Sequence, residues 1–277
     1  MSMEAAIEKM TESISATVPT PENEYLSKED GLLHCSVCHG KTQTRISFMG
    51  IEKVVRCICD CEKKRIQAHE EREKSEERER KRSICFAETN MMSWTFENDD
   101  RKNPQISDAM QNYVKHFAEF KKKGKGVLLY GTVGTGKTYL AACIANALID
   151  KDVSVVMSNF AKILNKLQEK DTDKQKFIDG FNKHSLLIID DLGVERATPF
   201  ALEQLFNVID SRYRSGLPFI ITTNLTAEEL KNPQDVAYSR IYDRILERCH
   251  PIKVEGTSRR RESLRDNFAD TQRLLGL

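Results

Sequence analysis

A glycine-rich octapeptide, Gly131-Thr132-Val133-Gly134-Thr135-Gly136-Lys137-Thr138, constrains this chain more than any other part of its sequence. The apolar run 127–130 precedes it, and a helix-forming stretch that begins with Tyr139 follows it. A strand, a glycine loop and a helix in this order form a phosphate cradle, because glycine lets backbone N–H groups close around phosphate oxygens. Lys137 supplies positive charge to the β- and γ-phosphates, and Thr138 can ligate Mg²⁺. The pattern predicts a nucleoside triphosphate site from Gly131 to Tyr139.

Length and charge narrow the class of protein around this loop. With 277 residues, the chain can form one good-sized core and a smaller module. Its net charge is +1, so any basic surface for nucleic acid must be local. No apolar stretch approaches the roughly 18 residues of a membrane span, and the N-terminus lacks a secretory apolar segment. We therefore expect a cytoplasmic protein without a membrane partner.

The cysteines are clustered, which favours metal coordination over disulfides. Five of them lie within 27 residues: Cys35, Cys38, Cys57, Cys59 and Cys61. The first two form a Cys-x-x-Cys knuckle, and the loop to the next three is long enough for four thiolates to surround one Zn²⁺. The favoured ligands are the first four cysteines of this group, and Cys61 can replace a member of the second pair. His34 and His39 are weaker ligand candidates, and metal-free reduced thiols are the alternative.

Composition divides the chain into four segments. Residues 1–30 contain a candidate amphipathic helix and a Pro-containing linker, and residues 31–62 hold the cysteine module. Residues 63–83 are mostly Glu, Lys and Arg with acid–base pairs at i,i+4 spacing, which predicts an exposed connecting helix. Globular composition resumes near residue 84, so we assign residues 84–277 to the nucleotide-binding domain. Within it, residues 107–122 have a helical apolar period.

Polar side chains follow the apolar strands predicted beyond the glycine loop. Residues 185–189 run into Asp190-Asp191, and residues 218–223 run into Asn224. Buried parallel strands deliver such side chains to their carboxyl ends, where nucleotides bind. Asp190 should join Thr138 in holding Mg²⁺, Asp191 should polarise the attacking water, and Asn224 should orient that water or contact the γ-phosphate. We predict an α/β P-loop ATPase fold, with a parallel sheet flanked by helices.

These motifs resemble those of AAA+ helicase loaders of the DnaC/DnaI type, phage-encoded loaders included, and of the related IstB ATPases. The resemblance covers about residues 84–265, through GTVGTGKT, LLIIDDLG, IITTNL and SRIYDRILERC…GTSRR. The cysteine module is similar to the amino-terminal zinc domain of DnaI-type loaders. The resemblance implies an AAA+ ATPase domain preceded by a small zinc-binding domain that contacts a helicase.

The resemblance also implies roles for arginines. Arg244 aligns with the arginine finger that reaches a neighbouring subunit's γ-phosphate, and Arg240 is the alternative. Arg260 aligns with the arginine of the second sensor. Because Arg259 stands where the family often has a hydrophobic residue, this assignment is open by one position.

The implied function is ATP-dependent delivery of the replicative hexameric DNA helicase onto single-stranded DNA. ATP, Mg²⁺ and Zn²⁺ would be the cofactors, and subunits would associate through their AAA+ domains. The family's DNA-contacting segment corresponds to residues 159–170, where Lys162, Lys166 and Lys170 form a stripe that a solvated helix face explains equally well. Two alternatives are an IstB-like ATPase that assists transposition and an adaptor that binds ATP without hydrolysing it.

Overall fold

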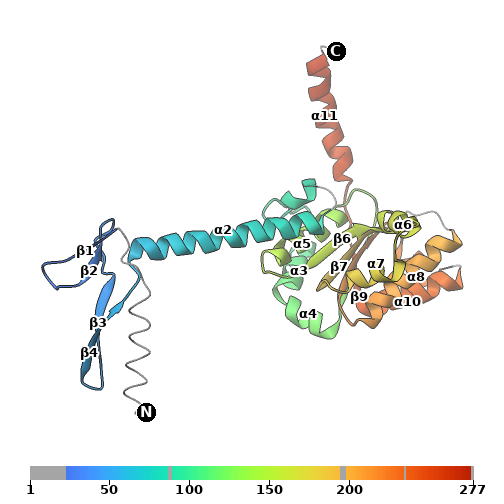
Figure 1. The fold of residues 1–277 in the computed structure, drawn as a ribbon. Coiled ribbons are helices and arrows are strands. Elements are labelled where there is room, and N and C mark those ends of the chain that lie inside the picture. Colours follow the sequence, from blue (N-terminus) through green and yellow to red (C-terminus); the bar gives the residue numbers. More distant parts are fainter. Residues whose placement is uncertain (1–22, 87–88, 194–197, 234, 276–277) are drawn as a thin grey trace, which may run out of the picture. The chain divides into compact units, whose positions relative to one another are not determined.

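A computed structural model describes residues 23–86, 89–193, 198–233 and 235–275 of the chain, as Figure 1 shows. Of residues 1–30, in which the sequence predicted an amphipathic helix and a linker, residues 1–22 lie outside this described part. The chain divides into two compact units, Met1–Glu76 and Glu77–Leu277. Among the described residues, no helix combines the length and the apolar character that a membrane crossing requires.

The first unit contains two small antiparallel sheets. Strand β1 (Glu24–Leu26) pairs with β2 (Leu33–Cys35), and β3 (Gln43–Phe48) pairs with β4 (Ile51–Arg56). Its buried hydrophobic side chains, in the described residues, are Leu32, Cys35 and Cys59. So small an apolar core does not stabilise a fold by itself, and two of its three members are potential metal ligands.

Helix α2 (Asp60–Cys85) occupies the charged segment in which the sequence predicted an exposed helix. Ion pairs such as Arg72–Glu76 follow its exposed surface. Its last residues belong to the second unit, where Arg82 Nε donates to Asn146 Oδ1 at 3.0 Å and Cys85 is buried.

The second unit is built on a five-stranded, all-parallel sheet with the order β6-β7-β8-β5-β9. The strands are β5 (Gly126–Tyr130), β6 (Val155–Asn159), β7 (Leu186–Leu192), β8 (Phe219–Thr223) and β9 (Cys249–Lys253). This sheet confirms the predicted α/β fold. The sequence did not predict β9, because Cys249 is its one buried residue and no apolar run marks this edge strand.

Helices cover both faces of the sheet and form two cores. Residues of α3 (Pro104–Lys115), α4 (Phe117–Lys123) and α5 (Lys137–Ile149) pack with Val127, Leu129, Ile188 and other strand residues. Alternate strand residues, including Leu128, pack with α6 (Phe160–Gln168), α7 (Lys174–Phe181), α8 (Pro199–Arg214), α9 (Ala227–Lys231) and α10 (Val236–Arg248). Because successive strand residues point to opposite faces, these are the two sides of a helix–sheet–helix sandwich.

Three features of this unit differ from the sequence expectation or add to it. The helix predicted over residues 107–122 is two helices, because the backbone of His116 leaves helical geometry at φ −101° and ψ 19°. A short 3₁₀ helix, η1 (Thr89–Ser93), precedes α3. Helix α11 (Arg259–Leu275) follows the last strand of the sheet.

Candidate active site and candidate metal centre

The glycine loop joins the carboxyl end of β5 to α5, as its sequence predicts. Lys137 opens the helix, and its side chain is buried within the loop. The ammonium group donates to the carbonyls of Gly131 at 2.9 Å and Thr132 at 2.7 Å, and to Asn224 Oδ1 at 2.8 Å. Burial lowers the pKa of Lys137. The structure thus brings together the lysine of the loop and the amide that follows β8.

Two glycines of the loop allow the start of α11 to approach closely. Gly134 and Gly136 have φ angles of +86° and +97°, which other residues adopt only with strain. A Cβ atom would lie 2.2 Å from Ser258 Oγ at Gly134 and 2.5 Å from Arg259 Nη1 at Gly136. The Arg259 N–H also donates to the Gly134 carbonyl at 3.0 Å. The glycines therefore serve contacts within the protein as well as any phosphate.

The two acidic residues at the end of β7 both contact one hydroxyl on the neighbouring strand β8, Asp190 through its carboxylate and Asp191 through its backbone N–H. Thr222 Oγ1 donates to Asp190 Oδ1 at 2.6 Å and accepts the Asp191 N–H at 2.9 Å. Burial raises the pKa of Asp190, and the nearby Thr222 and Thr138 hydroxyls oppose that shift. Adjacent hydroxyl and carboxylate oxygens are the donors that Mg²⁺ prefers, so Thr138 and Asp190 fit the predicted magnesium site. Sequence reasoning missed Thr222, whose only signal was a hydroxyl residue inside an apolar strand.

Asp191 has a backbone conformation that is rare for its residue type. Its φ is +52°, and the register between β7 and β8 shifts between Ile189 and Leu192. Such bulges redirect a side chain, and strained backbone of this kind concentrates at functional sites. The bulge leaves Asp191 in a cavity with Lys137 and Asn224.

Two adjoining cavities share Trp94, Thr138, Asp191 and Arg260 in their linings. The first has a volume of about 400 Å³ and is also lined by Val133, Gly134, Gly136, Lys137, Tyr139, Asn224 and Arg259. The second, of about 380 Å³, extends past Asp190 to Asn159 and Lys162. Most of the residues predicted for the phosphate site therefore meet in one place, together with Trp94, which no motif had singled out.

The two arginines at the start of α11 both line the first cavity. Arg259 makes an ion pair with Asp100, with 2.9 Å between Nη2 and Oδ1. Arg260 is close enough to Lys137 to lower its pKa further. The one-residue ambiguity in the sequence thus corresponds to two side chains at the same site.

Arg244 lies on α10 and is held by α8. Its Nε atom donates to Asp210 Oδ1 at 2.9 Å, and its guanidinium lies 4.8 Å from the centroid of the Phe206 ring. Arg240, one turn earlier, is exposed and lines an apolar groove of about 320 Å³ with Phe206 and Ile241. Across the described ranges, its side chain makes no hydrogen bond or ion pair, and neither arginine lines the two cavities at the glycine loop.

The lysines of the predicted DNA-contacting segment have different surroundings. Lys162 lines the second cavity, and Lys166 forms an ion pair with Glu169 at 2.6 Å. Lys170 follows the end of α6 at Gln168. The regular spacing in the sequence therefore does not correspond to three equivalent positions on one helix.

Four thiols of the first unit converge on a candidate metal centre. The Sγ atoms of Cys35, Cys38, Cys59 and Cys61 all lie within 4.8 Å of one another. Two of these separations are 3.5 Å, between Cys35 and Cys61, and 3.3 Å, between Cys59 and Cys61. Tetrahedral Zn²⁺ with bonds of about 2.3 Å needs sulfur separations of about 3.8 Å, so a modest expansion of the cluster accommodates zinc. Backbone N–H donors lower the pKa of Cys35 and bring that of Cys38 to about 6, which favours thiolates at these two positions, while hydrogen bonds with the neighbouring thiols raise the pKa of Cys61.

The structure corrects the favoured ligand set in one position. Cys57 was expected in the cluster, but its N–H donates to the Thr42 carbonyl at 2.8 Å and its thiol to the Lys41 carbonyl at 3.3 Å. Cys57 thus continues the β3–β4 pairing, and the chain turns toward the cluster only at the start of α2. Cys61, on the first turn of that helix, takes its place.

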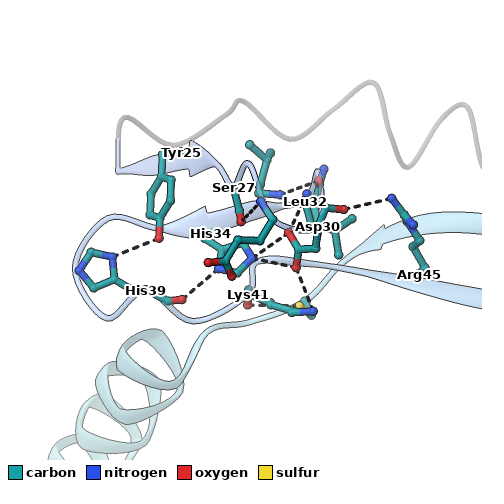
Figure 2. A network of polar contacts seen from close by, with 12 residues as sticks. Tyr25, Ser27, Asp30, Leu32, His34, His39, Lys41 and Arg45 are labelled. Carbon is teal, nitrogen blue, oxygen red and sulfur yellow. Dashed lines mark hydrogen bonds and ion pairs between the residues drawn. The ribbon is translucent and has the colours of Figure 1, made fainter.

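A polar network surrounds the Cys-x-x-Cys knuckle and uses both histidines that were weaker ligand candidates (Figure 2). His34 Nδ1 bonds the His39 carbonyl at 3.0 Å, and His34 Nε2 lies 3.2 Å from Asp30 Oδ2. The same carboxylate pairs with Lys41 at 3.0 Å, and His39 Nδ1 bonds the Tyr25 hydroxyl at 3.2 Å. With these nitrogens engaged, the histidines support the knuckle loop, and the four thiols are the candidate metal ligands.

Comparison with known proteins identifies the family of the second unit. Residues 62–266 match the family described as IstB-like ATP binding protein. The chain belongs to this family. The IstB-like chain is 28% identical over 191 residues to the replicative helicase loader DnaI of Bacillus subtilis, a match that covers 63% of this chain and 61% of DnaI. It is also 28% identical over 173 residues to a putative ATP-binding protein in an insertion sequence of Mycobacterium tuberculosis, covering 60% of this chain and 68% of that protein.

A solved structure supports the same relationship. The crystal structure of DnaI superposes with a TM-score of 0.55 at 27% identity, covering 65% of the IstB-like chain and 99% of the crystallised one. The resemblance to helicase loaders and IstB ATPases is thus confirmed, as is the AAA+ type of fold. With DnaI, however, the match spans less than two thirds of the relative's own length.

Proposed function

We propose that this chain is an ATP-dependent loader that delivers a replicative hexameric DNA helicase onto single-stranded DNA. The observation that carries the proposal is the similarity to DnaI, in both sequence and structure, on a chain that also has a four-thiol unit before its AAA+ domain. In this proposal, residues 31–62 contact the helicase and residues 84–277 bind ATP. Residues 63–83 connect these two segments.

The side chains at the carboxyl edge of the sheet have complementary roles in hydrolysis. Lys137 exchanges its carbonyl and amide partners for β- and γ-phosphate oxygens when ATP enters the cavity. Thr138 and Asp190 would hold Mg²⁺, which supplies charge neutralisation to the phosphates. Asp191 polarises the attacking water, and Asn224, released from Lys137, orients it.

A guanidinium from a second subunit would complete this site, because neither Arg240 nor Arg244 lines the cavities of its own chain. Arg244 was the favoured finger, but moving it costs its ion pair with Asp210 and its contact with the Phe206 ring. Arg240 is exposed at the rim of the α8/α10 groove and needs no such release. We therefore favour Arg240 as the finger and Arg244 as its structural support. Arg260 would act within the same subunit.

A pull-down by purified replicative helicase tests the partner. The full chain should be retained on immobilised helicase, and retention should fall at least tenfold after zinc removal by a chelator. Lys137→Ala should abolish ATP binding and leave the zinc unit intact. If retention does not depend on the four thiols, the first unit does not contact the helicase as proposed.

A second candidate function comes from the insertion-sequence relative. An ATPase that assists transposition would bind duplex DNA more tightly with ATP and would have no affinity for the helicase. A non-hydrolysing adaptor is a third possibility, for which Asp191→Asn would leave helicase delivery unchanged. Measuring duplex binding, helicase retention and delivery with the same preparations separates the three.

A further inference from the structure

Trp94 is the single tryptophan of the chain, and it lines both cavities at the glycine loop. It directly follows η1 and is half-buried. Its ring centroid lies 5.5 Å from that of Tyr139, with 38° between the ring planes. The Tyr139 hydroxyl donates to the Thr95 carbonyl at 2.9 Å. Two aromatic rings are thereby fixed at the first turn of α5, beside the lysine that the phosphates would contact.

The rest of the cavity lining is suited to phosphates and not to a base. Lys137, Arg259 and Arg260 are cationic, and Asp191 and Asn224 are the polar groups assigned to the attacking water beside the γ-phosphate. A nucleoside triphosphate held by these groups must place its uncharged base against another surface of the same site. Among the residues that line the first cavity, where Lys137 lies, the large apolar side chains are Val133, Trp94 and Tyr139.

Trp94 offers the best surface of these three. Val133 is 58% exposed and has no ring, and Tyr139 lines only the first cavity, whereas Trp94 lines both. We propose that the Trp94 indole stacks on the base of the bound nucleoside triphosphate. This inference rests on the proposed nucleotide site. It adds the residue through which that site prefers a nucleoside triphosphate to an inorganic phosphate chain.

Calorimetric titration of the full chain with ATP and with inorganic tripolyphosphate tests the proposal. Because stacking on an aromatic side chain contributes roughly 1–3 kcal/mol per base, Trp94→Ala should weaken ATP binding about tenfold. The same variant should bind tripolyphosphate within twofold of the wild type, and Trp94→Phe should recover most of the loss for ATP. Since every base has a π-face, ATP and GTP should be affected alike.

Phe96→Ala is the matched control, since Phe96 lies on the same segment but lines a separate cavity with Gln111 and Val114. It should leave the ATP-to-tripolyphosphate ratio unchanged. Equal weakening of both ligands by Trp94→Ala, or an unchanged affinity for ATP, would overturn the stacking role. If Lys137→Ala still binds ATP, the proposed nucleotide site itself fails, which is a different result.

Native fluorescence provides a second measurement that needs no variant. Because Trp94 is the only tryptophan, its emission reports on this site alone. ATP should quench that emission at the concentrations at which calorimetry detects binding, and tripolyphosphate should not. Identical responses to the two ligands would contradict stacking even if Trp94→Ala fails to fold.

Discussion

At the scale of single residues, the Thr222 hydroxyl connects the Asp190 carboxylate to the backbone of Asp191. It donates to Asp190 and accepts from the Asp191 backbone, so it fixes both the buried carboxylate and the bulge. Loss of such a supporting group typically costs about 10- to 100-fold in activity. We expect Thr222→Val to lower kcat for ATP hydrolysis at least about tenfold while the Kd for ATP stays within threefold.

Thr223→Val is the control for this prediction, because the adjacent hydroxyl donates to the Leu192 carbonyl and not to a carboxylate. Steady-state hydrolysis and equilibrium binding of the two variants should therefore differ. Equal losses of kcat would mean that Thr222 acts only through strand packing.

A residue of the candidate site could be predicted from the sequence where it belongs to a recognisable motif. The spacing of the glycine loop and the acid pair suffices to predict the meeting of Lys137, Asp190, Asp191 and Asn224 at one sheet edge. Trp94 and Thr222 have no such spacing, because they reach the site through tertiary packing of η1 and β8. The Cys57 prediction was wrong in its geometry, because sequence spacing does not reveal which cysteine continues a β-ladder.

At the scale of elements, Arg212 of α8 joins the loops that precede β7 and β8. It is 1% exposed and donates to the carbonyls of Phe181, His184, Ser185 and Pro218. Burial lowers its pKa to about 10. Since Arg212→Met would leave these carbonyls without their donor, we expect a loss of about 3 kcal/mol in the free energy of unfolding, measured by urea denaturation.

Arg214→Met provides the comparison for that measurement. Arg214 lies two residues further on, with its side chain 76% exposed, and pairs with Asp210. Exposed pairs contribute at most about 1 kcal/mol, so this variant should unfold close to the wild-type midpoint. If both variants unfold at the same urea concentration, the buried network does not stabilise the fold as we argue.

The first turn of α2 contributes a ligand to the candidate metal centre, which distinguishes Cys61 from Cys57. We expect Cys61→Ser to lower zinc affinity at least about tenfold, because a closed structural site needs four ligands. Cys57→Ser should retain one zinc per chain in metal analysis after dialysis. The reverse result would restore the ligand set favoured by the sequence.

At the scale of the whole molecule, the two candidate sites belong to different units. The thiol cluster lies in the unit that ends at Glu76, and the residues lining the nucleotide cavities all follow Glu77. Cys35→Ser should therefore abolish helicase retention while ATP binding stays within twofold of the wild type, as measured by calorimetry. A parallel loss of ATP binding would show that the zinc unit is needed to fold the second unit.

Helicase delivery to a closed circle of single-stranded DNA tests the central claim most directly. The quantity to measure is the amount of purified hexameric helicase bound to the circle, with the full chain and ATP present or absent. We predict efficient transfer by the wild-type chain with ATP, and transfer at least tenfold lower with Lys137→Ala. Transfer that is equal with and without ATP, or no transfer together with ATP-stimulated binding to duplex DNA, would contradict the loader function.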